Sequence, residues 1–189
     1  MLFLEVIAHF QQKDAGFWVV DTHAGAGLYD LTGVWANKRA EYQDGIARIW
    51  DLADAPPMVQ RYKEAIAKLN PDNTLTLYPG SPWLALQSLR AQDKVKLYEQ
   101  LSAEFDVLRK NLAQYPGLPP RAVTAEQHDG YAGLKSILPP ASKRAVTLID
   151  PSYEDKRDYR FVAEAMAQAI QRFPTGCYLI WYPRVNRRE

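Results

Sequence analysis

The stretch VTLIDPSYEDKRDY, residues 146–159, brings residue types that can do chemistry close together. The mostly apolar run of residues 146–149 leads directly to Asp150, Pro151 fixes the next backbone angle, and Tyr153 adds an aromatic ring. If the apolar run is a parallel strand, its carboxyl end delivers a hydrogen-bond acceptor, a rigid carbonyl and a stacking face into a ligand crevice. The plainer alternative is a core strand followed by a turn at Asp150 and a packing residue at Tyr153.

A second candidate site follows the apolar residues 17–20. The sequence FWVVDTHAGAGLYDL places Asp21, Gly25 and Gly27 directly after this run. Glycines suit a sharp turn after a strand where a ligand approaches the backbone closely. The dehydrogenase pattern G-x-G-x-x-G is absent from the sequence, and so is the Gly-Lys-Ser/Thr of a phosphate-binding P-loop. Taken alone, the glycines fit a plain tight turn equally well.

Two acids follow other predicted strands. Glu99 ends the run 95–98, where a carboxylate can accept hydrogen bonds from the two hydroxyls of a ribose. Asp129, in the segment EQHDGY, comes where it can accept from an adenine amino group. Each acid by itself is more often a solvated surface residue. Because the carboxyl ends of parallel strands meet at one edge of a sheet, acids and a glycine turn at three successive strand ends favour a ligand site there.

The elements that must position these residues are short apolar strands separated by helical stretches. Most of the strands lack alternation of polar and apolar residues, which is typical of a parallel sheet covered on both faces. We predict strands over residues 17–20, 95–98, 121–124, 145–149 and 178–181, and helices over residues 2–10, 39–50, 57–69, 103–112 and 158–173. The predicted fold is α/β, with a mainly parallel sheet of strand order 3-2-1-4-5 and a small helical insertion between the first two strands.

Composition sets limits on the class of protein. The 189 residues are 47% hydrophobic and 24% charged, which predicts one globular domain over residues 1–189. A net charge of +1 argues against a polybasic protein. The single cysteine, Cys177, rules out a disulfide framework or a cysteine-rich zinc site and fits a reducing cytoplasm. The opening MLFLEVIAHF is too short and too interrupted for a membrane span. We therefore expect a cytoplasmic protein with no membrane role and no metal.

Six motifs, in order across nearly the whole chain, carry a family resemblance: DTHAGAGLYDL, EYQDGIARIW, YPGSP, DGYAGLKSILPP, LIDPSYE and WYP. As a set they resemble the class I S-adenosylmethionine-dependent methyltransferases, and more closely the bacterial 23S ribosomal RNA adenine-N6 methyltransferase J family. The resemblance implies a Rossmann-like fold, S-adenosylmethionine as cofactor, and a monomer acting on 23S ribosomal RNA that is naked or early in assembly. It implies cofactor contacts at His23, Gly25, Gly27, Ser81, Glu99, Asp129, Gly130 and Asp150.

The resemblance also bears on the limits of the chain. It implies that residues of about 34–76 form an inserted helical subdomain. The family's N-terminal segment and the strands after the fifth are missing from this sequence, so the chain is expected to be part of a longer protein. The usual tetrad is Asp-Pro-Pro-Tyr, and Ser152 replaces its second proline. Two plainer interpretations stay open, namely that His23 is a structural turn residue and that Ser81 is a helix N-cap.

The tetrad would receive a target adenine. Asp150 and the Pro151 carbonyl can accept both hydrogens of the amino group, and Tyr153 can stack on the splayed base. Phosphate contacts are expected from Lys156, Arg157 and Arg160, and from Arg184, Arg187 and Arg188, although a solvated helix start and a frayed tail explain these cations equally well.

The alternatives are a DNA adenine methyltransferase and a nucleic-acid-binding protein without methyl transfer. The family's older label, catabolism of external DNA, agrees with either alternative. Sequence does not separate RNA from DNA as the substrate, because contacts to the 2′-hydroxyl are not encoded in motifs.

Overall fold

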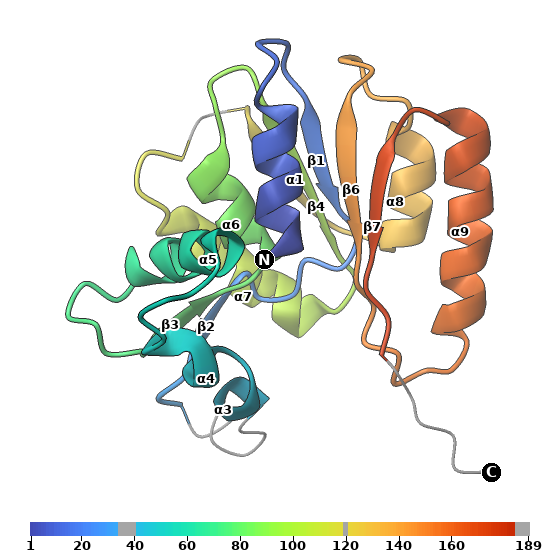
Figure 1. The fold of residues 1–189 in the computed structure, drawn as a ribbon. Coiled ribbons are helices and arrows are strands. Elements are labelled where there is room, and N and C mark those ends of the chain that lie inside the picture. Colours follow the sequence, from blue (N-terminus) through green and yellow to red (C-terminus); the bar gives the residue numbers. More distant parts are fainter. Residues whose placement is uncertain (34–40, 119–120, 184–189) are drawn as a thin grey trace.

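The computed structural model describes residues 1–33, 41–118 and 121–183. Its centre is a five-stranded parallel sheet of order β5-β4-β1-β6-β7 (Figure 1). The strands are β1 (Trp18–Asp21), β4 (Lys94–Glu99), β5 (Val123–Gln127), β6 (Ala145–Ile149) and β7 (Cys177–Ile180). Numbered by their order along the chain, they give the predicted arrangement 3-2-1-4-5, so the predicted fold class and topology are confirmed.

The strands are apolar on both faces because helices cover both sides of the sheet. In the central strand β1, Val19 pairs in register with Val95 on one side and with Val146 on the other. These three side chains face one hydrophobic core, whereas Val20 belongs to a second core on the opposite face. The continuous apolar runs in the sequence therefore reflect burial on two sides.

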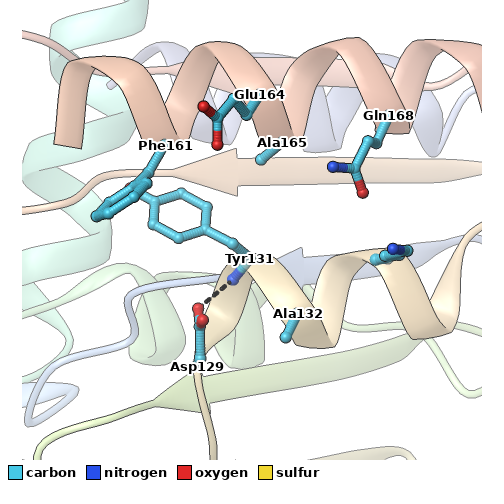
Figure 2. Close-up of a pocket in the computed structure, with 8 residues that line it drawn as sticks. Asp129, Tyr131, Ala132, Phe161, Glu164, Ala165 and Gln168 are labelled. Atoms are coloured by element: carbon cyan, nitrogen blue, oxygen red, sulfur yellow. Dashed lines mark hydrogen bonds between the residues drawn. The ribbon is translucent and has the colours of Figure 1, made fainter. Parts of the chain in front are cut away.

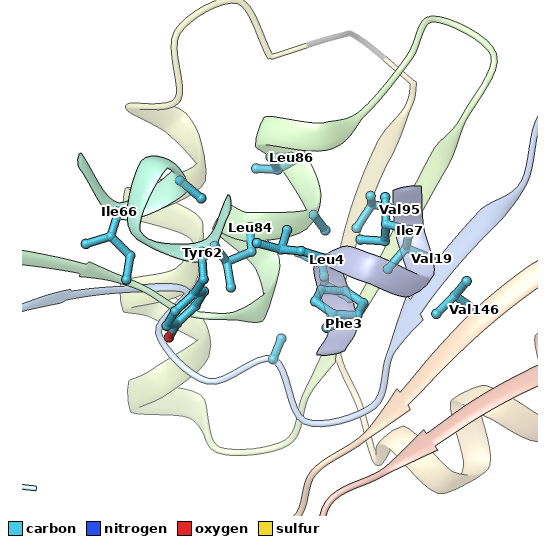
Figure 3. Packing of buried hydrophobic residues seen from close by; sticks show 14 of the residues in the cluster. Phe3, Leu4, Ile7, Val19, Tyr62, Ile66, Leu84, Leu86, Val95 and Val146 are labelled. Carbon is cyan, nitrogen blue, oxygen red and sulfur yellow. The ribbon is translucent and has the colours of Figure 1, made fainter. Parts of the chain in front are cut away.

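The larger core lies against the face that carries Val19. It is covered by α1 (Leu2–Phe10), α5 (Pro57–Ala67), α6 (Ser81–Ser88) and α7 (Ser102–Ala113). Figure 3 shows Phe3, Leu4 and Ile7 of α1 between the sheet and the neighbouring helices. Pro56 is the N-cap of α5 and Pro57 its first residue, a position where the missing backbone N–H costs nothing.

The second core lies between the other face of the sheet and two helices, α8 (Gly130–Ile137) and α9 (Asp158–Arg172). Leu134 of α8 and Val162 and Ala169 of α9 pack beside Val20 and Ile149. The apolar stripe predicted for residues 158–173 is thus partly core. Ile170, at one edge of that stripe, stays 50% exposed.

The segment between β1 and β4 contains features that sequence did not predict. A two-stranded antiparallel sheet joins β2 (Leu28–Asp30) to β3 (Leu77–Pro79), and α6 was also not predicted. Outside this segment, α8 after β5 was not predicted either. The single helix expected over residues 39–50 is wrong, because Gly45 separates α3 (Glu41–Asp44) from α4 (Ile46–Trp50). Its predicted start at Arg39 lies outside the described residues. The helices α3, α4 and α5 fall within the expected insertion, whose limits at about 34–76 stay a prediction.

Several boundaries differ from the predicted ones by a few residues. The strand expected at 121–124 begins at Val123 and continues to Gln127, because Arg121 adopts a positive φ of 69° in the preceding turn. The strands expected to begin at Phe17 and Tyr178 are each shifted by one residue. The helix expected at 57–69 ends at Ala67.

Candidate functional site

The predicted site residues gather at the carboxyl ends of the parallel strands. The backbone N–H of Thr22 donates to the Leu148 carbonyl at 3.1 Å, which holds the start of the turn after β1 beside the end of β6. The N–H of Ala24 donates to the Tyr98 carbonyl at 2.9 Å, which holds the same turn beside β4. The turn therefore lies between the strand that leads to Asp150 and the strand that ends in Glu99.

The glycines of this turn have the geometry that the sequence predicted for a tight turn. Gly25 and Gly27 have φ values of +57° and +75°, in the region where a side chain would be strained. The turn also continues into β2, which brings the N–H of Gly80 within 2.9 Å of the Gly27 carbonyl. The start of α6 is thereby tied to the glycine turn.

Asp21 is the last residue of β1 and is only 1% exposed. Its Oδ1 accepts from the backbone N–H of His23 at 3.2 Å, and its Oδ2 is buried without a hydrogen-bond partner among the described residues. The pKa of Asp21 is raised to about 7, mainly by burial; the Ser81 hydroxyl and the His23 N–H oppose the rise, and the nearby carboxylates of Asp150 and Glu99 add to it. A buried acceptor without a partner is suited to a ligand's amino group.

Glu99 ends β4 and is 8% exposed. Its Oε2 accepts from the N–H of Gly25 and its Oε1 accepts from the N–H of Leu101, each at 2.8 Å. Each carboxylate oxygen keeps a further lone pair, so the carboxylate can still accept from a ribose hydroxyl. In the structure this carboxylate holds the glycine turn.

Asp129 and Gly130 begin α8. Asp129 is its N-cap, and its Oδ1 accepts from the Tyr131 N–H at 2.9 Å. Gly130 packs so closely that an added Cβ would lie 1.9 Å from the Thr22 carbonyl oxygen. This close approach, which only glycine permits, brings the start of α8 against the turn after β1.

His23 and Ser81 face the same edge. The His23 Nδ1 lies 2.8 Å from the Thr22 hydroxyl, and burial lowers the pKa of His23 to about 4, which leaves the ring neutral near pH 7. Its ring makes an edge contact with Tyr131 at a centroid distance of 4.9 Å. The N-cap of α6 is Gly80, and Ser81 is the first helical residue, so the alternative of Ser81 as an N-cap is wrong.

A groove of about 240 Å³ runs between α8 and α9, starting at the edge of the site. Figure 2 shows Tyr131 pointing from α8 toward Phe161 of α9, with Asp129 beside it. The Tyr131 hydroxyl is buried without a hydrogen-bond partner among the described residues. The Tyr131 ring lies 6.2 Å from the Phe161 ring of α9, centroid to centroid, and burial, followed by Asp158, Tyr153 and Asp129, raises the pKa of Tyr131.

The tetrad follows β6 without a break. Pro151 is buried, and Asp150 reaches the surface, although partial burial raises the pKa of its carboxyl group. Tyr153 has a φ of +55°, which is rare for an aromatic residue, and its hydroxyl donates to the Trp181 carbonyl at 2.9 Å. Strained backbone of this kind is concentrated at functional sites. Ser152 is exposed.

The predicted phosphate-binding cations lie just before α9 and in its first turn. Arg157 pairs with Asp155 at 2.6 Å, and Arg160 lies 3.5 Å from Glu164. Both guanidinium groups lie over the Phe161 ring, at 5.9 and 5.3 Å. Lys156 is exposed. The other predicted cations, Arg184, Arg187 and Arg188, lie outside the described residues.

Within residues 1–33, 41–118 and 121–183, no group of three or more histidine, cysteine, aspartate or glutamate side chains is placed to hold a metal ion. No helix in those ranges has the length and apolar character that crossing a membrane requires.

Sequence reasoning did not assign Tyr131, Tyr159 or Trp181 to the site. Tyr159 and Trp181 make ring contacts with Tyr153, and Tyr131 contacts His23. The sequence around each residue could have pointed to it. Tyr131 directly follows Asp129 and Gly130, Tyr159 follows the cations Lys156 and Arg157, and Trp181 is the first residue of the motif WYP. Their proximity, however, depends on how α8, α9 and β7 pack.

The chain is similar to known proteins over nearly its whole length. Over 97% of its length, the chain is 38% identical to "Ribosomal RNA large subunit methyltransferase J" of Haemophilus influenzae and 39% identical to the protein of the same name from Escherichia coli K12. It is also similar to the crystal structure of protein LPL1258 from Legionella pneumophila, with a TM-score of 0.87 and 36% identity over 97% of this chain and 66% of that one. The chain spans 64% of the length of the two curated relatives.

The family match covers most of the chain. The model of the family described as "Ribosomal RNA large subunit methyltransferase D, RlmJ" matches residues 14–189, which include the glycine turn, Glu99, Asp129 and the tetrad. The resemblance inferred from the six motifs is thus confirmed, and the chain belongs to the RlmJ family of ribosomal RNA large subunit methyltransferases.

Proposed function

We propose that this chain forms the cofactor-binding and catalytic part of an S-adenosylmethionine-dependent enzyme that methylates the N6 amino group of an adenine in 23S ribosomal RNA. One observation carries the proposal, namely that the tetrad begins at the end of β6, next to the glycine turn after β1. Asp21 and Leu148 are register partners, so Asp150 follows two residues beyond the strand pair that supports the turn. Such an edge can bind a cofactor and a base side by side.

The residues at this edge suit S-adenosylmethionine. Glu99 and Asp129 offer carboxylate acceptors for the ribose and the adenine amino group, and the unpartnered Oδ2 of Asp21 suits the amino group of the amino-acid end. His23, Gly25, Gly27, Ser81, Gly130 and Asp150 complete the proposed cofactor site. When bound, S-adenosylmethionine supplies an electrophilic methyl group, and the protein supplies orientation.

The tetrad would act on the target base. The lone pair of an adenine amino group is delocalised into the ring, so acceptors for both hydrogens favour the pyramidal geometry that can attack a methyl group. Asp150 and the Pro151 carbonyl would be those acceptors. Tyr153 would stack on the splayed base, an interaction worth about 1–3 kcal/mol. The bond from its hydroxyl to the Trp181 carbonyl supports this role, because it restrains the ring.

Phosphates of the RNA would be bound beside the tetrad by Lys156, Arg157 and Arg160. Their position at the start of α9 supports this assignment. On binding, Arg157 and Arg160 would have to leave their ion pairs with Asp155 and Glu164, or contact a phosphate and the carboxylate together. The protein is proposed to act as a monomer on naked or early-assembly RNA in the cytoplasm, without a metal ion.

The test is methyl transfer from tritiated S-adenosylmethionine by the full-length protein. Naked 23S ribosomal RNA and duplex DNA are offered in parallel, and the product nucleosides are separated by mass. We expect label in N6-methyladenosine from RNA, and none with an Asp150→Ala control. Label in DNA alone would indicate a DNA adenine methyltransferase. Binding of nucleic acid with no transfer to either substrate would contradict the proposed activity.

A further inference from the structure

We propose that Tyr159 and Trp181 form a stacking surface for the nucleotide next to the target adenine in single-stranded RNA. The inference rests on the proposed function, since it extends the base site beyond Tyr153. It assigns binding roles to two residues, one from α9 and one directly after β7, that the tetrad itself does not include.

Both aromatic rings contact Tyr153. The Tyr159 ring lies 4.6 Å from the Tyr153 ring, centroid to centroid, with an angle of 46° between the planes. The Trp181 ring lies 6.2 Å from Tyr153, at 50°. The N–H of Trp181 donates to the Ile149 carbonyl at 3.1 Å, which ties it to the end of β6 directly before the tetrad. The three rings therefore form one aromatic cluster at the strand ends, defined by Tyr153, Tyr159 and Trp181.

Within residues 1–189, the outer two rings of this cluster face solvent. Tyr159 is 44% exposed and Trp181 is 52% exposed, although both residue types usually bury most of their large apolar surface. Their exposed faces are therefore available for a ligand to stack on. Tyr153 itself is less exposed, so the cluster offers its accessible faces mainly through Tyr159 and Trp181.

The chemistry of the surroundings favours a nucleotide as the occupant. Every base has a flat π face, and single-stranded nucleic acids stack successive bases on aromatic side chains. Tyr159 lies between Arg157 and Arg160 in the chain, and Lys156 is close by, so cations that could contact phosphates lie beside the ring, although Arg157 pairs with Asp155 and Arg160 with Glu164. If the target base stacks on Tyr153 with its amino group at Asp150, the base of the adjoining nucleotide meets the other two rings.

The test pairs protein variants with RNA oligonucleotides that contain one target adenine. One oligonucleotide is intact, and two others are abasic at the nucleotide before or after the target. In the full-length protein, we expect Trp181→Ala to raise the KM for the intact oligonucleotide about tenfold, equivalent to about 1.4 kcal/mol. With the oligonucleotide that lacks the stacked base, Trp181→Ala should change the KM little. The same comparison applies to Tyr159→Ala.

Control variants separate stacking from folding. Trp181→Phe keeps an aromatic face and should retain most of the affinity. Ile170→Ala removes a 50% exposed apolar side chain from the outer surface of α9 and should leave the KM unchanged. The affinity for S-adenosylmethionine and the melting temperature are measured for every variant, so that a loss of folding is distinguished from a loss of stacking. The backbone carbonyl of residue 181 remains available to the Tyr153 hydroxyl in all of the variants.

A second readout does not depend on catalysis. Binding of the intact oligonucleotide should quench tryptophan fluorescence in the wild-type protein and quench it less in Trp181→Phe. The stacking surface would be overturned if Trp181→Ala and Tyr159→Ala raised the KM equally for the intact and the abasic oligonucleotides. It would also be overturned if the intact oligonucleotide did not quench tryptophan fluorescence in the full-length wild-type protein. Quenching that depends on Trp181, without methyl transfer by the wild type, would instead contradict the proposed function and leave the surface standing.

Discussion

The Glu99 carboxylate accepts a hydrogen bond from the backbone N–H of Gly25 at 2.8 Å, which links the end of β4 to the glycine turn after β1. The other oxygen of the same carboxylate accepts from Leu101. A residue predicted to bind the cofactor's ribose therefore also shapes the turn on which the cofactor would lie. The two roles can be separated by experiment.

We expect Glu99→Ala to weaken S-adenosylmethionine binding by about 1.5–3 kcal/mol, because the ribose hydroxyls lose a charged acceptor. Calorimetry on the full-length protein measures this loss. An S-adenosylmethionine analogue without the 2′ and 3′ hydroxyls serves as the control. If Glu99 binds the ribose, the substitution costs the analogue much less. If both ligands lose the same affinity, Glu99 acts only through the turn.

Asp150→Asn should slow the chemical step, because an amide lacks the charge that stabilises the amino group as it becomes cationic. A loss of about a hundredfold is the scale expected for one preorganised group. Asp150→Ala should be slower still. Single-turnover methyl transfer is measured together with the melting temperature. A turn-capping role would instead lower the melting temperature and preserve turnover per folded molecule, and a fully active Asp150→Ala enzyme would end the proposed mechanism.

Gly130→Ala should destabilise the fold by about 1–3 kcal/mol, because its Cβ would lie 1.9 Å from the Thr22 carbonyl and would push α8 away from the turn. Urea unfolding measures the change. Gly33→Ala is a matched control, since its nearest neighbour would be the Asp30 carbonyl oxygen at an ordinary 3.5 Å. Equal stabilities of the two variants would contradict the close approach.

Asp21 should lower the stability of the folded state as the pH rises, which is the opposite of the usual effect of a salt-bridged carboxylate. Its folded pKa of about 7 lies above the ordinary value of 3.8, so the folded state holds a proton that the unfolded state has lost between about pH 4 and pH 7. The stabilisation of the folded state that protonated Asp21 contributes is complete below about pH 4 and is lost as the pH rises through about 7. The lowered pKa of His23, about 4, acts in the opposite direction below its ordinary value of 6.5.

The variant Asp21→Asn isolates this contribution. Its melting temperature, relative to that of the wild type, should rise as the pH increases from 4 to 8, because the amide does not lose a proton. His23 is present in both proteins, so its effect cancels in the difference. A difference in melting temperature that is constant over this pH range would show that Asp21 does not titrate there.

Sequence by itself determined the order of the five parallel strands and several of the helices between them. The mostly apolar runs at 145–149 and 95–98, interrupted only by Thr147 and Lys96, lack the alternation of a strand with one solvated face, and this predicts a parallel sheet covered on both faces. The same runs identify Glu99 and Asp150 as residues at strand ends. The six motifs determined the family, because their order and spacing form a specific set although each one is weak alone.

The tertiary structure decided which side chains meet. The short strands β2 and β3 pair across almost fifty residues of chain, and no local periodicity encodes such a pair. Asp21 was visible in the sequence, but its burial, and hence its raised pKa, depends on α6 and the neighbouring strand ends packing over it. Tyr153, Tyr159 and Trp181 come from three segments and form one cluster only because β6 and β7 pair in parallel beside α9. Contacts between distant segments arise from packing, so the sequence indicated the site's strand ends while the fold decided its aromatic surface.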